Sequence, residues 1–398
     1  MSVRHIAICT DGLSNDWLGG MNYFRNLVAA FDGAQADDLK LHVLTDHAGF
    51  LDGLALSNRV EVHVLPMLRR RSLAWAARKA RQVVTGRDVA LLAVLRRLKV
   101  SAVVFSFVAG AKRHGIRCVP WVPDFQFVHH PEFFPPAIVA AERRRTARYL
   151  AVADSLVVSS QVARNDAIAH FNARPQDTHV LRFVPCVDSA PLCSTALRDT
   201  VLQRYGVTQP YLFLPNQYWK HKNHELVVQA MGSLVKQGQP LPLVLSTGKT
   251  QDFRNPDHFA SVLGQITALG IETHYRVLGI IPRQDMLVLL AHSGAVLNPS
   301  RFEGWSTTVE EAKALGKQLL LSDIPVHREQ VAGVPGVQMF GPSDAAAMAR
   351  LLSAWYQHNG HAAVGAFPPQ PDRSLYGVFE AEYIALLRQL AAPVRHSQ

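Results

Sequence analysis

The feature that most limits how this chain can fold is a repeated alternation of short apolar runs with amphipathic stretches of helical length. Apolar runs of strand length lie at 4–10, 41–44, 60–65, 103–107, 118–122, 156–159 and 180–184, and again at 211–214, 243–246, 274–278, 295–297 and 318–321. Strands that alternate with helices form parallel sheets with helices on both faces. The sequence therefore predicts an α/β protein with two doubly wound, Rossmann-like sheets, one in residues 1–187 and one in residues 206–373. The irregular segment 185–195 reads as a linker, and 374–390 as a final helix.

One stretch, Asn298 to Glu311, combines a strand end, a short loop and the start of a helix that Thr307 or Thr308 can cap. The unpaired N–H groups at a helix N-terminus favour phosphate oxygens, and the hydroxyl side chains at 306–308 add donors. Two carboxylates, Glu303 and Glu311, flank this anion site, which suits a ligand that also carries sugar hydroxyls. Glu310 points about 100° around the helix from Glu311, so we expect its replacement to cost little. The alternative is a capped surface helix with two solvated glutamates.

The pattern F-E-G-x5-E-A, followed by Gly316, by L-S-D-I-P at 321–325 and by Arg328-Glu329, resembles the signature of glycosyltransferase family 4. Members of that family are retaining, metal-independent enzymes of the GT-B fold that use nucleotide sugars. The resemblance implies an N-terminal acceptor-binding domain, a C-terminal donor-binding domain and a last helix, 374–398, that crosses back to the first. It also implies that Glu311 holds the donor ribose, that Glu303 contacts the sugar, and that Gly304, Trp305, Ser306 and Thr307 line the donor site.

The stretch V-P-D-F-Q-F-V-H-H-P-E-F-F at 122–134 is too polar for a core element and follows a predicted strand. Active sites of α/β proteins lie at such strand ends. The stretch resembles a segment of a bacterial branch of the same family. By that match His129 points at the donor sugar, and Asp124 and Gln126 shape the acceptor pocket. Phe127 stands where the branch often has histidine, and a purely structural role for His129 stays open.

The stretch P-N-Q-Y-W-K-H-K-N-H at 215–224 also follows a predicted strand. In most relatives an arginine and a lysine six residues apart neutralise the leaving diphosphate. Lys222 matches the lysine, whereas Asn216 occupies the arginine position, and Lys220 could supply the missing charge. The resemblance implies that Asn216 and Gln217 contact the donor. The alternative is a basic surface turn.

Three further loops are candidates for donor contacts. A loop from Gly12 to Gly20 separates the first strand from its helix, and Gly19-Gly20 resembles the glycine pair whose backbone approaches the donor. There is no G-x-G-x-x-G, so this loop could also be a flexible turn. Gly248 ends another strand; the G-K-T that begins there is no Walker A motif, because Leu243 stands where that motif needs glycine. Ile280-Ile281 resembles the loop that stacks on the nucleotide base.

The net charge of +10 is concentrated in one segment. Residues 69–99 hold ten Lys or Arg and one acid, Asp88, which gives +9. On a helical wheel, one face carries Leu73, Ala76, Ala77, Ala80, Val83 and Val84, and the other carries Arg78, Lys79 and Arg81. Such a helix can lie on an anionic membrane; alternatively, its apolar face packs on the sheet and its basic face is only solvated. No nucleic-acid-binding module is recognised.

The sequence offers no strong metal site and no membrane span. An Asp-x-Asp motif is absent, so we expect no cofactor and no metal in the reaction, with the nucleotide sugar as co-substrate. Four cysteines without a C-x-x-C pair argue against a disulfide framework or a zinc site. No apolar run reaches the ~18–20 residues of a spanning helix, and Met1 leads directly into a strand. These features predict a cytoplasmic protein, with the basic segment as a peripheral contact to the inner membrane.

The resemblance implies a retaining transfer from a nucleoside diphosphate sugar, with GDP-mannose favoured and a UDP-sugar as the other choice, to a glycan or lipid-linked glycan of a bacterial surface polysaccharide or lipopolysaccharide. One rival is another enzyme of this fold, such as a phosphorylase or a sugar-phosphate synthase. The second rival is an inactive paralogue that serves as a binding partner in a polysaccharide assembly complex, which Asn216 would favour.

Overall fold

The computed structural model describes residues 3–11 and 18–392. The chain divides into two compact units, the first made of residues up to 125, 140–186 and from 376 onward, and the second of 126–139 and 187–375. The predicted α/β class with two doubly wound parallel sheets is confirmed, because every strand pair in both units is parallel.

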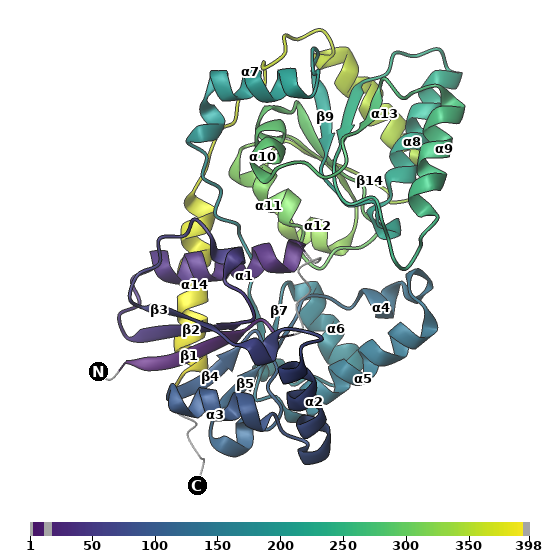
Figure 1. Cartoon of the computed structure of the whole chain (residues 1–398). Helices are drawn as coiled ribbons and strands as arrows, with labels where there is room; N and C mark the ends of the chain where they lie inside the picture. Colours follow the sequence, from purple (N-terminus) through teal and green to yellow (C-terminus); the bar gives the residue numbers. More distant parts are fainter. Residues whose placement is uncertain (1–2, 12–17, 393–398) are drawn as a thin grey trace. The chain divides into compact units, whose positions relative to one another are not determined.

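The first unit is built on a five-stranded sheet with the order β3-β2-β1-β4-β5 (Figure 1). Its strands are β1 (Arg4–Cys9), β2 (Leu39–Thr45), β3 (Val60–Val64), β4 (Val100–Val104) and β5 (Arg117–Val119). Its helices are α1 (Leu18–Gly33), α2 (Leu73–Thr85), α3 (Val89–Arg97), α6 (Gln161–Phe171), most of α5 (Pro136–Val152) and α14 (Ser374–Leu390). Arg388 of α14 bonds to Asp38 beside β2 with an Nη2–Oδ1 distance of 2.9 Å, which ties the last helix to this sheet.

Three short strands, β6 (Trp121–Val122), β7 (Leu156–Val158) and β8 (Thr178–Val180), form a separate sheet in the first unit. The predicted single strand 118–122 is therefore wrong, because it is divided between β5 and β6 at Pro120. Proline has no N–H to donate to a ladder, so a strand breaks there easily. The Pro120 carbonyl instead accepts from Val157 N at 3.0 Å.

The second unit is built on a six-stranded sheet with the order β11-β10-β9-β12-β13-β14. Its strands are β9 (Tyr211–Leu214), β10 (Leu243–Ser246), β11 (Tyr275–Val277), β12 (Ala295–Asn298), β13 (Leu319–Ser322) and β14 (Val337–Phe340). Its helices are α4 (Gln126–His129), α7 (Thr195–Arg204), α8 (His224–Lys236), α9 (His258–Leu269), α10 (Arg283–His292), α11 (Thr307–Ala314), α12 (Pro325–Gln330) and α13 (Ala345–Asn359).

Alternating side chains of the second sheet enter two separate cores. In β9, Leu212 and Leu214 pack with α8, α9 and α13 on one face, and Tyr211 and Phe213 pack with α7, α10 and α11 on the other (Figure 1). Because side chains alternate across a strand, a strand buried on both faces is apolar throughout. This arrangement explains why Y-L-F-L reads as one apolar run.

The apolar face of helix α2 does not pack on the sheet, which excludes one of the two alternatives left open by the sequence. Leu73, Val83 and Val84 are 91%, 83% and 86% exposed, whereas Arg78 is 5% exposed. Arg78 Nη2 bonds to Asp88 Oδ2 at 2.7 Å and also to Asp11, so the inner face of the helix is held by ion pairs. The expectation that the apolar face packs on the sheet is wrong. A buried charge is stable here because two carboxylates pair with it.

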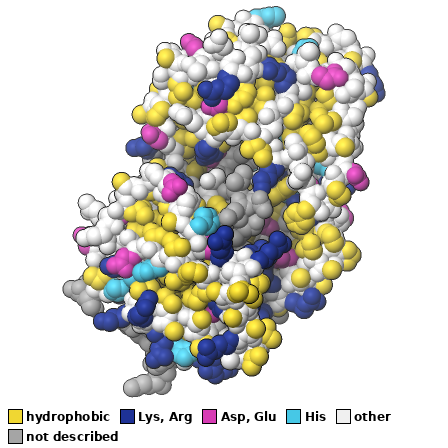
Figure 2. Space-filling model, viewed as in Figure 1, with side chains coloured by type: hydrophobic (Ala, Val, Ile, Leu, Met, Phe, Trp, Pro, Cys, Tyr) yellow, Lys and Arg dark blue, Asp and Glu magenta, His cyan; other side chains and the backbone are white. Residues whose placement is uncertain are grey.

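The exposed side of α2 combines that apolar stripe with cations. Arg69, Arg70, Arg71 and Arg81 are exposed, and Figure 2 shows Lys and Arg side chains beside hydrophobic ones over the part of the first unit that holds α2 and α3. Among the described residues, no helix is both long and apolar enough to cross a membrane.

Candidate active site at the carboxyl ends of the second sheet

The candidate site lies where β9 and β12 run side by side. Strand β10, which follows β9 in the chain, lies on one side of β9, and β12 lies on its other side. The carboxyl ends of β9 and β12 therefore form a topological switch point. Ligands of open α/β sheets bind outside such points. Asn216 and Asn298 follow and end these two strands, both are buried, and Asn216 Nδ2 donates to Asn298 Oδ1 at 3.2 Å.

Lys222 and Glu303 form the central pair of the site. Lys222 Nζ lies 2.7 Å from Glu303 Oε1 and 2.8 Å from Oε2, and Ser300 Oγ donates to Oε1 at 2.6 Å. Burial by itself raises the pKa of Glu303, but the charges of Lys222 and His327 and the hydrogen bonds from Lys222 and Ser300 together hold that pKa below its ordinary value. Glu303 is therefore an ionised, buried carboxylate, and the expectation of a solvated surface glutamate is wrong.

Asn223 holds the loop that carries Lys222. It adopts a left-handed conformation with φ 60°, and its Nδ2 donates to Pro299 O and Pro342 O, each at 2.9 Å. Asparagine tolerates this conformation better than most residues. In the loop after β12, Arg301 donates its backbone N–H to His221 O at 2.7 Å. Lys222 is thus fixed by backbone contacts to the loop after β12, and Lys220 by its N–H to Asp252 Oδ2 at 3.3 Å.

Gly248 brings the loop after β10 against the loop after β9. Its φ is 143°, and a Cβ there would lie 2.7 Å from Asn216 O, so only glycine fits. Gln217 Oε1 in that neighbouring loop is buried without a hydrogen-bond partner among the described residues. Such an orphan acceptor needs an explanation, and a ligand donor would supply one. Ile280, in the loop after β11, is 67% exposed, and Ile281 is partly exposed.

Helix α11 begins beside the same pair. Ser306 caps it by accepting from Val309 N at 3.4 Å, and Asn298 Nδ2 donates to Ser306 Oγ at 2.8 Å. Gly304, Trp305 and Thr307 are partly exposed around this helix start. The predicted cap at Thr307 or Thr308 is wrong by one or two residues, but the predicted order of strand, loop and helix is confirmed.

Glu311 is almost fully buried and its Oε1 pairs with Arg283 Nη2 of α10. Sequence reasoning missed Arg283, because nothing in its local pattern points across to α11. Arg283 is 46% exposed, so it covers the carboxylate from the solvent side and can move aside or share it with a ligand.

Glu310 does not fit the expectation that its replacement costs little. It is 1% exposed, and its Oε1 accepts from Lys313 Nζ at 2.9 Å and from Gln330 Nε2 at 3.0 Å. Burial raises the pKa of Glu310, and Lys313 opposes that shift. Its replacement would leave buried donors unpaired, so we correct the expectation of a small cost.

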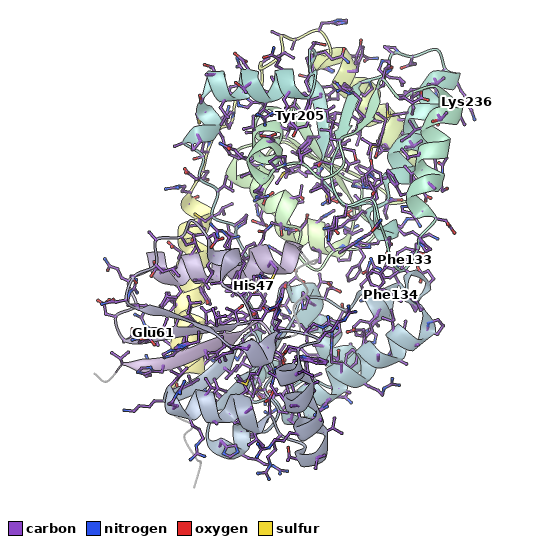
Figure 3. All side chains as sticks on the ribbon, in the orientation of Figure 1. His47, Glu61, Phe133, Phe134, Tyr205 and Lys236 are labelled. Carbon is purple, nitrogen blue, oxygen red and sulfur yellow. The ribbon has the colours of Figure 1, made fainter. Side chains whose placement is uncertain are left out.

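The segment 126–139 belongs to the second unit, and it brings His129 to the loop that carries Glu303 and Gln126 to the loop after β10. The His129 ring stacks on Phe302 at 5.7 Å between centroids. Gln126 Oε1 accepts from Arg254 Nη1 at 3.4 Å. Arg254, which the sequence did not single out, also lies 4.9 Å above the ring of Phe134, labelled in Figure 3.

Three predicted residues lie in the first unit. Gly19 and Gly20 fall in the first turn of α1, so the expected loop up to Gly20 is too long, and its residues 12–17 lie outside the described ones. Asp124 is partly exposed and follows β6.

Comparisons with known proteins give the fold of the chain and a family model that part of it matches. Residues 203–363 match the family model described as glycosyl transferases group 1. The comparison with curated proteins found no match. Among solved structures, the chain is similar to a glycosyltransferase from Rickettsia africae, with 12% identity over all of both chains and a TM-score of 0.68.

Two further structures have the same architecture. The chain is similar to Anabaena HepE in complex with UDP-glucose, with 15% identity over 99% of this chain and all of that one, and a TM-score of 0.66. It is also similar to WaaG, described as a glycosyltransferase involved in lipopolysaccharide biosynthesis, with 14% identity over 97% and 95% of the chains and a TM-score of 0.54. The chain therefore has the GT-B fold, and its residues 203–363 match the model of the glycosyl transferases group 1 family.

Proposed function

We propose that this protein is a retaining glycosyltransferase that moves a sugar from a nucleoside diphosphate sugar to a glycan or a lipid-linked glycan. The observation that carries the proposal is the Lys222–Glu303 pair at the switch point of the second sheet, with Nζ–Oε1 at 2.7 Å. A fixed cation beside an ionised carboxylate suits a donor that has both a diphosphate and a sugar. Surrounding donors and the helix start of α11 strengthen that reading.

The chemistry is charge stabilisation. As the bond to the sugar breaks, negative charge grows on the leaving diphosphate, and Lys222, Lys220 and the N-terminus of α11 oppose it. In the proposed retaining route the acceptor proton passes to that phosphate on the same face, so no protein nucleophile forms. Glu303 and His129 orient the sugar. No metal step is required in this scheme.

The resemblance and the position of these loops support three further contacts of the donor. Glu311 accepts from the ribose hydroxyls, Gln217 Oε1 accepts from the donor, and Ile280 and Ile281 cover the base.

GDP-mannose remains the favoured donor from the bacterial branch, and the UDP-glucose complex of HepE supports a UDP-sugar as the other choice. The role of WaaG supports a surface lipopolysaccharide or polysaccharide as the product class. Calorimetric titration with UDP, GDP, ADP and TDP identifies the base, and donor hydrolysis by the purified protein tests activity.

The inactive binding partner is the second candidate, because Asn216 replaces a cation that most relatives place there. Its buried contact to Asn298 at 3.2 Å shows what the side chain does instead. Nucleotide binding with no hydrolysis or transfer of any cognate donor would favour this candidate, whereas turnover would exclude it.

The exposed stripe of α2 suits the surface of an anionic membrane, where each Lys or Arg contributes about 1 kcal/mol. We expect the protein to co-sediment with anionic vesicles at low salt. Replacing Arg69, Arg70, Arg71 and Arg81 together by Gln should release it, whereas the same number of changes at the exposed Arg113, Arg174, Arg328 and Arg373 should not. Absence of co-sedimentation for the unchanged protein would contradict the membrane contact.

A further inference from the structure

Histidines and their neighbours form a polar row across β1, β2 and β3 of the first sheet. His42 pairs in register with Ala7 of β1 and Glu61 of β3, and Leu44 pairs with His63. Because paired residues share a face and residues two apart in a strand do too, one face carries His5, Lys40, His42, Glu61 and His63. This row uses none of the residues of the candidate active site.

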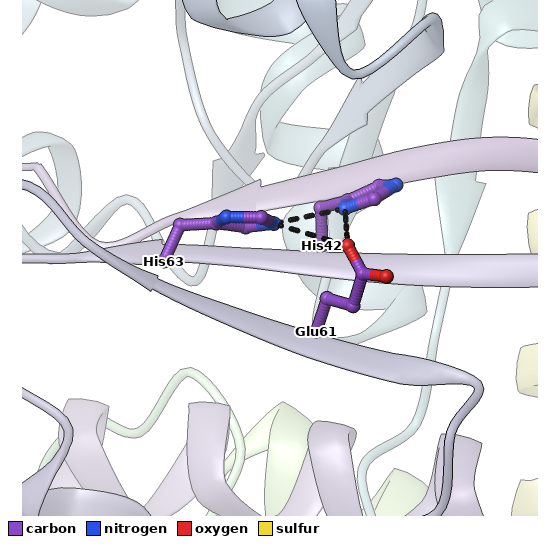
Figure 4. Close-up of side chains that lie close together, drawn as sticks. All are labelled: His42, Glu61 and His63. Carbon is purple, nitrogen blue, oxygen red and sulfur yellow. Dashed lines mark hydrogen bonds and ion pairs between the residues drawn. The ribbon is translucent and has the colours of Figure 1, made fainter.

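Three ligand atoms in this row form a compact triangle (Figure 4). His42 Nδ1 lies 3.0 Å from His63 Nε2 and 3.4 Å from Glu61 Oε2, and His63 Nε2 lies 3.6 Å from the same oxygen. Zn²⁺ bonds of ~2.0–2.2 Å at tetrahedral angles place neighbouring ligand atoms about 3.3–3.6 Å apart. The triangle therefore has the size of one face of a zinc tetrahedron.

Neighbouring side chains orient two of the three atoms. His5 Nδ1 lies 2.9 Å from His42 Nε2, which leaves His42 Nδ1 for the triangle. Lys40 Nζ bonds to Glu61 Oε1 at 2.5 Å, which leaves Oε2 facing the histidines. Partners of this kind fix the ring tautomer and the carboxylate of metal sites.

The protonation states agree with this geometry. Burial lowers the pKa of His42 to about 4 and also lowers the pKa of His63, while the hydrogen bond from Lys40 lowers the pKa of Glu61. At neutral pH His42 and His63 are neutral imidazoles and Glu61 is a carboxylate, which are the forms that bind a metal. The same distances also fit an alternative without a metal, in which hydrogen bonds run from His5 through His42 to His63.

We propose that His42 Nδ1, His63 Nε2 and Glu61 Oε2 bind a divalent transition metal, with Zn²⁺ favoured and water in the fourth position. The Glu61 and His63 side chains are 42% and 23% exposed, so solvent reaches the ligands, whereas His42 is 2% exposed. The ion joins β3 to β2, so its bound state stabilises this edge of the first sheet.

The test titrates the full-length protein, freed of metal by chelator and dialysis, with Zn²⁺ in a calorimeter and with Co²⁺ in a spectrophotometer. We expect one Zn²⁺ per chain, the visible absorption of four-coordinate Co²⁺, and a thermal midpoint that rises with Zn²⁺ concentration. His63→Ala should abolish all three signals. His5→Phe should keep the stoichiometry and weaken binding about 10–100-fold.

The exposed His114, in the same unit, provides the matched control, and His114→Ala should bind like the unchanged protein. Glu61→Gln serves as a second ligand variant in case His63→Ala does not fold, and it should also lose the Co²⁺ absorption. Equal binding in the unchanged protein and either ligand variant would overturn the proposal. Absence of micromolar Zn²⁺ binding by the folded, unchanged protein would overturn it too and favour the hydrogen-bonded alternative without a metal.

Discussion

Two buried cations, Arg78 in the first unit and Lys222 in the second, show how similar ion pairs serve different ends. Arg78 Nε donates to Asp88 Oδ1 and Oδ2 at 3.1 and 3.0 Å, its Nη1 donates to Met67 O at 3.1 Å, and its Nη2 reaches Asp11. The guanidinium thus bonds on all sides and joins α2 to the N-cap of α3. Its side chain is only 2% exposed.

Lys222 differs from Arg78 in its position and in how many of its N–H donors are bonded. It lies at the carboxyl ends of parallel strands, its side chain is 15% exposed, and its described hydrogen bonds both go to Glu303. An ammonium has three donors, so at least one remains for a ligand. The comparison teaches that a fully bonded cation indicates structure, and a cation with spare donors at a strand end indicates function.

We expect the largest effect from a substitution that breaks the ion pair between Arg78 and Asp88. Arg78→Leu leaves the buried Asp88 without its cationic partner and Asp11 with Lys79 alone, so we expect the free energy of unfolding to fall by about 3–5 kcal/mol. Urea denaturation measures this, with Arg81→Leu on the exposed side of the same helix as control. Activity per folded molecule should stay near normal. A stability change equal to that of the control would contradict the structural role of Arg78.

We expect the next largest effect from a substitution that breaks the pair between Lys222 and Glu303. Lys222→Met removes the charge that opposes the leaving diphosphate, so we expect turnover of the donor to fall by roughly 10²–10³. Lys236→Met, at the exposed end of α8 and labelled in Figure 3, is the control. Glu303→Gln should depress turnover while leaving affinity for the nucleoside diphosphate nearly intact. Turnover of Lys222→Met within twofold of normal would remove Lys222 from the mechanism.

A third change sharpens the comparison on α11. Glu311→Ala removes up to two charge-assisted hydrogen bonds of ~1.5–3 kcal/mol each, so nucleotide affinity should fall roughly tenfold to several thousandfold. Calorimetry with the nucleoside diphosphate measures it. The exposed Glu272→Ala replaces Glu310 as the control. Equal affinity in Glu311→Ala and the unchanged protein would show that this carboxylate serves Arg283 only.

The smallest expected effect is that of chelation. If Lys222 and the helix start stabilise the leaving group, EDTA should leave turnover unchanged at temperatures well below unfolding. A lower thermal midpoint in EDTA would be consistent with loss of a metal from the first sheet. Loss of turnover that Mg²⁺ or Mn²⁺ restores would contradict the metal-independent transfer.

Much of the fold could be predicted because its signals are local. The strands Tyr211–Leu214 and Leu243–Ser246 and the helix Ser374–Leu390 have the predicted bounds, since apolar runs and their flanks report secondary structure directly. The candidate residues Lys222 and Glu303 could likewise be found from their place after strands, although their pairing could not. Pro120 shows the limit, since it divides a run that looks continuous in hydrophobicity.

The sequence by itself determined the α/β class, the order of strands and helices, and the loops that carry the candidate site, because periodicity and turn residues act over a few positions. Only the tertiary structure decided which side of α2 faces inward, that Arg283 covers Glu311, and that His42, Glu61 and His63 meet on one sheet face. The reason is that the burial of a charged or polar side chain depends on partners far along the chain. Asp11 and Asp88 make a buried Arg78 stable, and both lie outside residues 73–85, so a helical wheel of that segment contains neither.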